Sequence, residues 1–467
     1  MFRSIWLVCL FPWLAAIAQP AGAQDKPALR EALALEEAIQ DAIAAAEPSV
    51  ACILVSHSNQ RPNLADPGYV PELFGSGVVI DQQGLILTNY HVVRDEPTQI
   101  YVRLLGGKGS YARIHAADPR SDLAVLQLRD KLDLKPIKLG DAGKVRKGQF
   151  VICLSNPYAA GSRDGSPSAS QGIISNIRRR APGNPKQEKE EAEVPRGNQK
   201  KPLQRYSTLF QTDARLNLGC SGGALINLRG EMIGLTTSLA ALSGGETAGG
   251  FAVPMDAAIQ KIVKVLKEGK EVEYGFLGVS LSPEAGRGVG VRLADDQFQF
   301  PVIRGSPAEK AGLKRGDTIL KVNGMSVNYN DDLFLALGML LAGSEAQLEV
   351  RSGLGTRRVS ATLVKYHVSG KIVAANAPAD VRGIRVDYTS ILAQTAPLIG
   401  PVMIHPGVYV KEVRPGSAAD KAEIRVLDVI TRVNGHSVST PDEFYERAKQ
   451  PGPLELTLET NRTVKLN

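Results

Sequence analysis

The chain has 467 residues, of which 43% are hydrophobic and 22% are charged, as in ordinary globular proteins. This length is enough for about three domains of roughly 100–200 residues each, and the composition excludes a wholly disordered chain. The formal net charge is +7. Because no nucleic-acid-binding motif accompanies that charge, we expect a generally basic surface and no nucleic-acid partner.

Residues 1–23 are typical of a secretory signal peptide. Arg3 supplies the positive start, an apolar stretch runs from Ile5 to Ile17, and residues 21–23 form an A-x-A cleavage site. The apolar stretch is too short for a comfortable membrane span, and the alternative is an uncleaved N-terminal anchor. We therefore expect an exported protein, periplasmic or located in the cell envelope or outside the cell.

Three cysteines remain once Cys9 is removed with the signal peptide: Cys52, Cys153 and Cys220. An odd number in an exported protein argues against a full disulfide framework. The count allows one bridge, and the sequence does not identify its pair.

Residues 24–48 favour a helix. The segment is rich in Ala, Leu and Glu, its apolar residues Leu29, Leu33, Ile39 and Ile43 recur at helical spacing, and Pro48 ends it. The apolar face either packs on its own domain, which is the commoner case, or forms a contact between subunits.

From residue 49 to residue 254, short β-rich runs alternate with turn clusters, which is typical of a sandwich or a barrel. The run "MDAAIQKIVKVLKEG" then predicts a helix that buries Ile259, Ile262, Val263 and Leu266 and ends before Gly269. We therefore place one mainly β domain at 49–269. Within it, the polar segment 177–206 holds four prolines and both charge signs, and it predicts a surface loop.

The C-terminal part contains an internal repeat. "GSPAEKAGLKRGDTILKVNGMSV" (305–327) resembles "GSAADKAEIRVLDVITRVNGHSV" (416–438). The repeat predicts two copies of one small domain, at 275–368 and 381–467, joined by a linker at 369–380.

Ser221 lies in an unusual setting, between Gly219, Cys220, Gly222 and Gly223. Such a run is often only a flexible loop. It also suits a nucleophile on a tight turn, with bare backbone N–H groups beside it to hold an oxyanion. A serine nucleophile needs a base, normally His, and a carboxylate that orients the base.

Of the six histidines, His91 stands out because it follows an apolar strand at the point where the chain turns. Asp122 opens directly into the strand Leu123–Leu128, so its carboxylate can be buried against a histidine. Asp118 stands in a D-P turn and is better explained by turn chemistry. A third candidate, Asp213, is interpreted as a structural residue that supports the loop before Ser221.

Four motifs in the order His, Asp, Ser and closing helix now resemble a known family: "GSGVVIDQQGLILTNYHVV", "DPRSDLAVLQL", "LFQTDARLNLGCSGGALIN" and "GGFAVPMDAAIQKIVKVL". Together with "YGFLGVSL" and the repeat, they make residues 45–467 similar to Deg/HtrA-type serine proteases. The resemblance implies a mainly β fold: a chymotrypsin-like double β-barrel protease domain followed by two α+β PDZ domains.

The resemblance also implies roles. Ser221 would attack the scissile carbonyl, His91 would be the general base, Asp122 would orient it, and the backbone of Gly219, Cys220 and Ser221 would form the oxyanion hole. The implied activity is ATP-independent cleavage of unfolded proteins, without metal or cofactor, in a homo-oligomer that is a trimer or a multiple of one. Two alternatives remain: an inert chaperone or scaffold, and an esterase that uses the same triad.

Departures from the family pattern raise further questions. Cys220 replaces the usual Asn and is either a redox handle or, more simply, a small packed side chain. Leu218 and Ala224 stand where Pro is usual. Arg215 occupies the position that forms the base of the S1 pocket, where an inward guanidinium would favour acidic substrates and an outward one would leave small aliphatic preference unchanged.

The two repeats also differ. Phe276, Leu277 and Gly278 match the family's carboxylate-binding turn, and "RGIRV" (382–386) takes that place less convincingly in the second copy. Glu423 and Leu427 replace the glycines found at Gly312 and Gly316 in the first copy. We expect the first copy to bind C-terminal peptides and the second to be altered or structural. Segment 177–206 falls where the family has a regulatory loop, so it is either a switch or an untethered insert.

Overall fold

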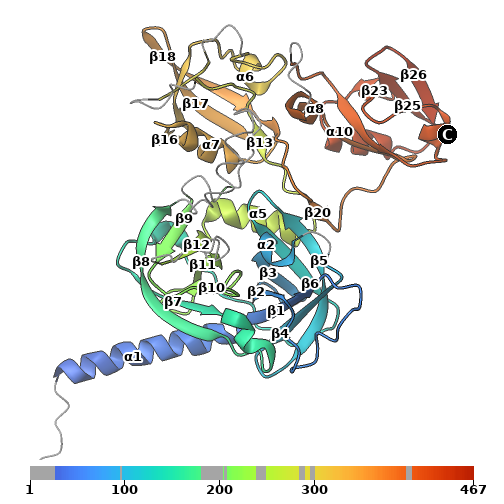
Figure 1. Ribbon diagram of the computed structural model, residues 1–467. Coiled ribbons are helices and arrows are strands. Elements are labelled where there is room, and N and C mark those ends of the chain that lie inside the picture. Colours follow the sequence, from blue (N-terminus) through green and yellow to red (C-terminus); the bar gives the residue numbers. More distant parts are fainter. Residues whose placement is uncertain are drawn as a thin grey trace, which may run out of the picture.

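The computed structural model describes residues 27–94, 97–179, 203, 208–237, 249–282, 290–294, 300–395 and 402–466 (Figure 1). The predicted signal peptide and most of segment 177–206 lie outside these residues. The described part contains two barrels followed by two smaller α+β domains, so the predicted mainly β fold is confirmed. No helix in it is long and apolar enough to cross a membrane.

The first barrel is built from six antiparallel strands in the order β5-β4-β1-β2-β3-β6, closed by pairing of β5 with β6. Its strands are β1 (Val50–Ser56), β2 (Leu73–Val79), β3 (Leu85–Asn89), β4 (Gln99–Leu104), β5 (Gly109–Asp118) and β6 (Leu123–Leu128). Ile53, Val102 and Leu126 belong to the cluster of buried residues that fills its interior.

The second barrel closes in the order β10-β11-β12-β9-β8-β7. Its strands are β7 (Phe150–Ser155), β8 (Ser168–Arg179), β9 (Leu209–Thr212), β10 (Ala224–Ile226), β11 (Met232–Thr237) and β12 (Gly250–Pro254). Short 3-10 helices lie at Glu47–Ser49, Ala142–Lys144 and Pro157–Ser162. A further cluster joins the barrels, with Val78 and Leu87 from the first and Ile152 and Ile226 from the second. One shared cluster therefore joins the two barrels, whose interiors are filled by separate clusters.

Two helices pack on that shared cluster. α5 (Ala257–Lys267) is capped by Asp256, whose carboxylate accepts from the backbone N–H groups of Ala258 and Ile259 at 3.0 Å each. It buries Ile259, Ile262 and Leu266 as predicted, whereas Val263 is only partly buried. α1 (Pro27–Ala46) buries only its C-terminal end at Ala42 and Ala46, whereas Leu29 and Leu33 are 49% and 48% exposed. The C-terminal half of α1 thus packs on its own domain, and the first half projects from the barrels (Figure 1).

The first repeat domain runs from β13 to β19. Its elements are β13 (Gly275–Phe276), β14 (Val291–Arg292), α6 (Pro307–Lys310), β15 (Thr318–Val322), β16 (Met325–Ser326), α7 (Asn330–Gly338), β17 (Glu345–Ser352), β18 (Gly355–Thr362) and β19 (Val364–Lys365).

The second repeat domain runs from β21 to β26. Its elements are β21 (Ile384–Tyr388), α8 (Thr389–Thr395), β22 (Val408–Val413), α9 (Ala418–Lys421), β23 (Val429–Val433), β24 (His436–Ser437), α10 (Pro441–Ala448), β25 (Leu454–Leu458) and β26 (Thr463–Leu466). α6 and α9 occupy the same place in the two copies, and each begins at a serine cap, Ser306 and Ser417.

The predicted linker 369–380 lies against the first barrel. Its β20 (Val373–Ala374) pairs antiparallel with β5, with Val373 opposite Ala117 and Ala374 opposite Ala116. The bond from the Ala375 N–H to the His115 carbonyl, at 2.9 Å, extends this contact. The chain therefore returns to the barrel between the two repeat domains (Figure 1).

A buried joint connects the first repeat domain to the barrel. Tyr274 is fully buried and donates its hydroxyl hydrogen bond to Asp118 at the end of β5. Arg120 lies over the rings of Tyr274 and Tyr366, 4.9 and 4.2 Å from the ring centroids. Burial raises the pKa of Asp118, and its hydrogen bonds to Ser121 and Tyr274 oppose that rise. This joint thus couples the repeat domain to the turn that precedes Asp122.

A buried lysine connects the two repeat domains. Lys365 Nζ lies 2.7 Å from Glu271, 3.3 Å from Glu273 and 2.9 Å from Asp387, and its side chain is 6% exposed. Lys411 reaches the same Asp387 at 3.2 Å from a side chain that is 45% exposed. Burial disfavours the charged form of Asp387, but Lys365 and Lys411 outweigh it and hold its pKa below the usual range.

Replacing Lys365 by Met should destabilise this junction strongly, because three carboxylates then share a site without their buried cation. We expect a loss of about 3–5 kcal/mol in the free energy of unfolding, measured by urea titration with near-ultraviolet circular dichroism. Lys411→Met is the matched control and should cost about 0–1 kcal/mol, since that amine is partly solvated.

The free energy of unfolding should depend on pH differently in wild type and in Lys365→Met. The pKa of Asp387 is lowered in the native state. Its contribution to stability is therefore present at neutral pH and is lost as pH falls through the native-state pKa. The stability difference between wild type and Lys365→Met should therefore narrow in acid. A difference that stays constant down to the acid limit would contradict this account.

Candidate active site

His91 lies on α2 (Tyr90–Val93), a single turn that follows β3. The carboxylate of Asp122 holds it twice: Oδ1 accepts from the His91 backbone N–H at 2.9 Å, and Oδ2 lies 2.7 Å from Nδ1. Both side chains are largely buried, with 18% of His91 and 8% of Asp122 exposed. The double contact fixes the orientation of the ring and leaves Nε2 pointing away from Asp122.

Asp122 itself adopts a left-handed backbone conformation, with φ of 56°. Asp tolerates this region better than most residues. The same turn aims the Asp122 carbonyl at α2, where it accepts from the Tyr90 N–H at 2.9 Å and from the Asn89 side chain at 3.0 Å. Main chain and side chain of Asp122 therefore position the histidine together.

Ser221 comes from the other barrel, in the turn before β10, and is 5% exposed. Its Oγ lies 2.9 Å from His91 Nε2. The three residues predicted from the sequence are thus brought into one hydrogen-bonded row. A hydroxyl in this position can pass its proton to the imidazole, and the carboxylate can stabilise the resulting cation.

Ser76 on β2 joins the two halves of the site. Its backbone N–H donates to the Ser221 carbonyl at 2.8 Å, and its hydroxyl donates to the Gly219 carbonyl at 2.8 Å. The same hydroxyl accepts from the Asn156 N–H at 2.8 Å. Ser76 is fully buried. The loop that carries Ser221 is therefore held directly against the barrel that carries His91 and Asp122.

The glycines around Ser221 make this close approach feasible. Gly219 and Gly222 have φ of 94° and 86°. A Cβ at Gly222 would lie 2.1 Å from the Ser76 carbonyl oxygen, and one at Gly223 would lie 2.6 Å from that of Leu154. Both contacts are with backbone, which cannot move aside as a flexible side chain can.

The predicted set of three oxyanion donors needs one correction. The backbone N–H of Cys220 donates to the Asn217 carbonyl at 3.0 Å, so it closes the turn and is not available to a substrate. The N–H groups of Gly219 and Ser221 remain as the two candidate donors.

The Cys220 thiol is packed inside the protein. Cys220 is 2% exposed, and its sulfur accepts from the Asn217 N–H at 3.3 Å. Burial raises its pKa, and burial also raises the pKa of Cys52 and of Cys153 to about 12. All three cysteines are free and buried. A thiol that is neutral and inaccessible supports the packed side chain over the redox handle.

Arg215 does not line the cleft beside Ser221. Its side chain is exposed, and its backbone N–H donates to the Ser170 hydroxyl at 2.9 Å. The neighbouring Leu216 packs closely on Gly250 instead. A small cleft of about 50 Å³ opens at Ser221, and its lining residues are Glu72, Leu73, Phe74, His91, Val92, Arg94, Leu218, Gly219 and Ser221.

The two other aspartates have local roles. Asp118 accepts from the backbone N–H groups of Arg120 and Ser121 at 3.3 and 3.0 Å, which is the predicted turn chemistry. Asp213 accepts from the Ile173 N–H at 2.6 Å and so ties β9 to β8 below the Ser221 loop. In segment 177–206, Leu203 is buried and donates its N–H to the Arg120 carbonyl at 2.8 Å, so the segment is anchored at this point.

The candidate carboxylate turns are alike in both repeat domains. Gly278 has φ of 84° and packs on Ser306, while Gly383 has φ of 92° and packs on Ser417. Their carbonyls accept from the N–H groups of Ile303 and Arg414 at 2.9 and 2.8 Å. The second copy therefore keeps these glycine contacts, but Arg382 stands where the first has Leu277 and has a left-handed backbone, with φ of 54°.

The non-glycine replacements in the second copy also keep the backbone of the first. Glu423 and Leu427 have φ of 58° and 77°, close to the 73° and 76° of Gly312 and Gly316. Side chains resist this conformation, at a cost of about 1–2 kcal/mol per residue.

Comparison with known proteins agrees with this geometry. The profile of the trypsin-like peptidase domain matches residues 75–235, and that of the PDZ domain matches 301–351 and 409–462. A probable periplasmic serine endoprotease, DegP-like, of Pseudomonas putida (strain W619) is 30% identical over 398 residues, which cover 84% of this chain and 76% of the relative. The chain belongs to this DegP-like, HtrA-type family of serine endoproteases.

Other relatives agree with this assignment. A probable serine protease, do-like, of Buchnera aphidicola subsp. Acyrthosiphon pisum (strain APS) is 28% identical over 373 residues, covering 79% of this chain and 70% of the relative. The solved structure of the HtrA-type protease AlgW with a tripeptide has a TM-score of 0.52 and 26% identity, and it covers 71% of this chain and 98% of that one. The protein is thus a serine endopeptidase with two PDZ domains.

Several residues of the site could not be singled out from the sequence. Ser76 stands in an apolar run, and the only signal was its position between Gly75 and Gly77. The pairing of Tyr274 with Asp118 spans 156 residues and has no local signal. In the described part of the chain, no group of three or more His, Cys, Asp or Glu side chains could hold a metal ion.

Gly222→Ala should lower peptidase activity by at least tenfold, because the new Cβ would push the Ser221 loop away from Ser76. Gly106→Ala is the matched control: its φ of 82° is similar, but a Cβ there meets nothing within 4 Å. It should retain near wild-type activity and lose only about 1–2 kcal/mol of stability. Hydrolysis of a fluorogenic peptide and thermal unfolding measure the two effects, and equal losses of activity in both variants would contradict the account.

Proposed function

We propose that this chain is an exported, ATP-independent endopeptidase that cleaves unfolded or misfolded proteins through a triad of Ser221, His91 and Asp122. The observation that carries the assignment is the hydrogen-bonded row from Asp122 Oδ2 to His91 Nδ1, at 2.7 Å, and from His91 Nε2 to Ser221 Oγ, at 2.9 Å. The periplasmic names of the relatives and the signal-like N-terminus support an exported location.

In the proposed mechanism, Ser221 Oγ attacks the scissile carbonyl while His91 Nε2 takes its proton. Asp122 keeps the proton of His91 on Nδ1 and stabilises the imidazolium. The N–H groups of Gly219 and Ser221 hold the oxyanion of the tetrahedral intermediate, and His91 then returns the proton to the leaving amine. Water repeats the sequence on the acyl-enzyme and releases the second product.

The PDZ domains fit regulation of this site. In our proposal a peptide C-terminus binds the turn of Phe276, Leu277 and Gly278 in the first domain. That domain meets the protease where Arg120 lies over the ring of Tyr274. Tyr274 donates to Asp118, and the Arg120 carbonyl accepts from the Leu203 N–H. Asp118 also holds Ser121, the neighbour of Asp122, so a shift of the PDZ domain has a short path to the triad. The anchored Leu203 favours a switch over an untethered insert for segment 177–206.

Oligomer formation is part of the same proposal. Leu29 and Leu33 on the projecting half of α1 are about half exposed, and a second copy would cover them. The assembly expected for the family is a trimer or a multiple of one.

Ser221→Ala should abolish cleavage of a reduced, unfolded protein, and Asp122→Asn should lower kcat by roughly 10⁴-fold, because the histidine then rests in the wrong tautomer. Digestion is followed by gel electrophoresis, with cleavage sites mapped by mass spectrometry. If neither wild type nor variant cuts even with C-terminal peptides added, and aggregation of the unfolded protein is still suppressed, the protein is a chaperone.

Gly278→Ala should abolish stimulation and binding by C-terminal peptides, because a Cβ there lies 2.3 Å from that of Ser306. Gly383→Ala is the matched control in the second PDZ domain, with its Cβ 2.2 Å from that of Ser417. Fluorescence anisotropy with a labelled peptide, in the Ser221→Ala background, should show loss of binding in the first variant alone. Loss only in the second would reverse the assignment of the peptide-binding domain.

A further inference from the structure

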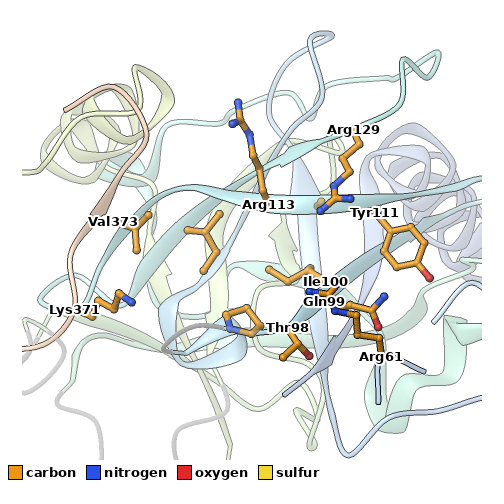
Figure 2. Close-up of a pocket in the computed structure, with 12 residues that line it drawn as sticks. Arg61, Thr98, Gln99, Ile100, Tyr111, Arg113, Arg129, Lys371 and Val373 are labelled. Carbon is orange, nitrogen blue, oxygen red and sulfur yellow. The ribbon is translucent and has the colours of Figure 1, made fainter. Parts of the chain in front are cut away.

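A groove lies between β4, β5 and the linker, and its lining includes no residue of the triad (Figure 2). We call it the outer groove, and its volume is about 590 Å³, within the range of about 300–1,000 Å³ that ligand sites occupy. Its lining residues are Arg61, Pro97, Thr98, Gln99, Ile100, Tyr111, Ala112, Arg113, Ile114, Arg129, Lys371 and Val373.

The outer groove exists because two strands share one edge of β5 without meeting. β4 pairs with β5 only from Gly109 to Ala112, and β20 pairs with it only at Ala116 and Ala117. In the described part of the chain, no strand pairs with Arg113 and Ile114 on this edge. A short section of sheet edge therefore lies open between the barrel and the linker.

The rim of the outer groove is basic and its floor is apolar. The exposed side chains of Arg61, Arg113, Arg129 and Lys371 stand around it, and none of the lining residues that the structure describes is acidic (Figure 2). Among the described residues, no ion pair involves any of the three arginines. The floor is formed by Ile100, Ala112, Ile114 and Val373.

We propose that the outer groove binds an extended acidic segment of polypeptide. Its main chain would add to the open edge of β5, its carboxylates would pair with the arginine rim, and its intervening apolar side chains would cover the partly exposed Ile114 and Val373. A strand turns alternate side chains to opposite faces, so an alternating acidic and apolar sequence fits both rim and floor. A free phosphate ion would use the rim alone and leave both the floor and the strand edge uncovered.

The bound segment would also bridge two parts of this chain. Lys371 and Val373 belong to the linker, whereas Arg113 and Arg129 belong to the barrel. An acidic peptide that contacts both would hold β20 against β5 and so hold the linker in place. This binding does not depend on the peptidase activity, since it needs neither Ser221 nor a PDZ domain.

The test uses the full chain with Ser221→Ala, so that no probe is cut. The probe is a fluorescein-labelled peptide of alternating Glu and Val with an amidated C-terminus, which removes the carboxylate that a PDZ domain would capture. The Arg113→Glu/Arg129→Glu variant should weaken binding at least tenfold in fluorescence anisotropy. Arg146→Glu/Lys147→Glu makes the same charge change at exposed positions on the second barrel and should weaken it less than twofold.

Two further peptides test separately whether binding depends on the alternating order of residues and on the negative charge of the peptide. A peptide of the same composition with its Glu and Val residues in two blocks should bind at least fivefold more weakly. An alternating Lys and Val peptide should bind the Arg113→Glu/Arg129→Glu variant better than wild type, which also establishes that the variant is folded.

Three results would overturn the proposal. They are equal binding of the alternating peptide to wild type and to the Arg113→Glu/Arg129→Glu variant, equal binding of the block peptide, or competition by inorganic phosphate at concentrations comparable to the peptide. Binding of phosphatidylglycerol vesicles without binding of the peptide would assign the groove to a membrane surface instead.

Discussion

The hydrogen-bonded row of Asp122, His91 and Ser221 depends on the contact of Ser76 with the loop that carries Ser221. His91 and Asp122 belong to one barrel and Ser221 to the other, so their distances are fixed only if the barrels keep their relative position. Ser76 secures that position with a backbone and a side-chain hydrogen bond, both 2.8 Å long. The glycines at 222 and 223 are the condition for this approach, since any side chain there would meet a backbone carbonyl.

A large part of the fold and of the row could be predicted from the sequence. Spaced turns identified the β domain, the repeat identified the two C-terminal domains, and the periodicity of α5 identified its buried face. Ser221, His91 and Asp122 could be chosen because each has a local signal: glycines around a serine, a histidine at a strand end, and an aspartate that opens an apolar strand. These signals come from chemistry within a few residues, which a sequence displays directly.

The remaining features arise from contacts between distant segments. The bond from Ser76 to Gly219 spans 143 residues, and the one from Tyr274 to Asp118 spans 156. The Cys220 N–H closes a turn onto Asn217, which depends on a backbone geometry that residue types alone do not fix. Likewise, Glu423 and Leu427 keep the left-handed conformation of the glycines they replace, because the surrounding domain dictates it. Tertiary structure decides each of these positions.

Docking of the linker at β20 changes how the second PDZ domain can move. A free linker would let that domain sweep a wide volume, whereas attachment of residues 373–374 to β5 divides it into two short tethers. The second PDZ domain therefore remains near the first barrel at a high effective concentration. Two attachments therefore limit the reach of this domain: the two-residue strand β20 on the barrel, and the buried contact of Lys365 with Asp387, which joins it to the first PDZ domain.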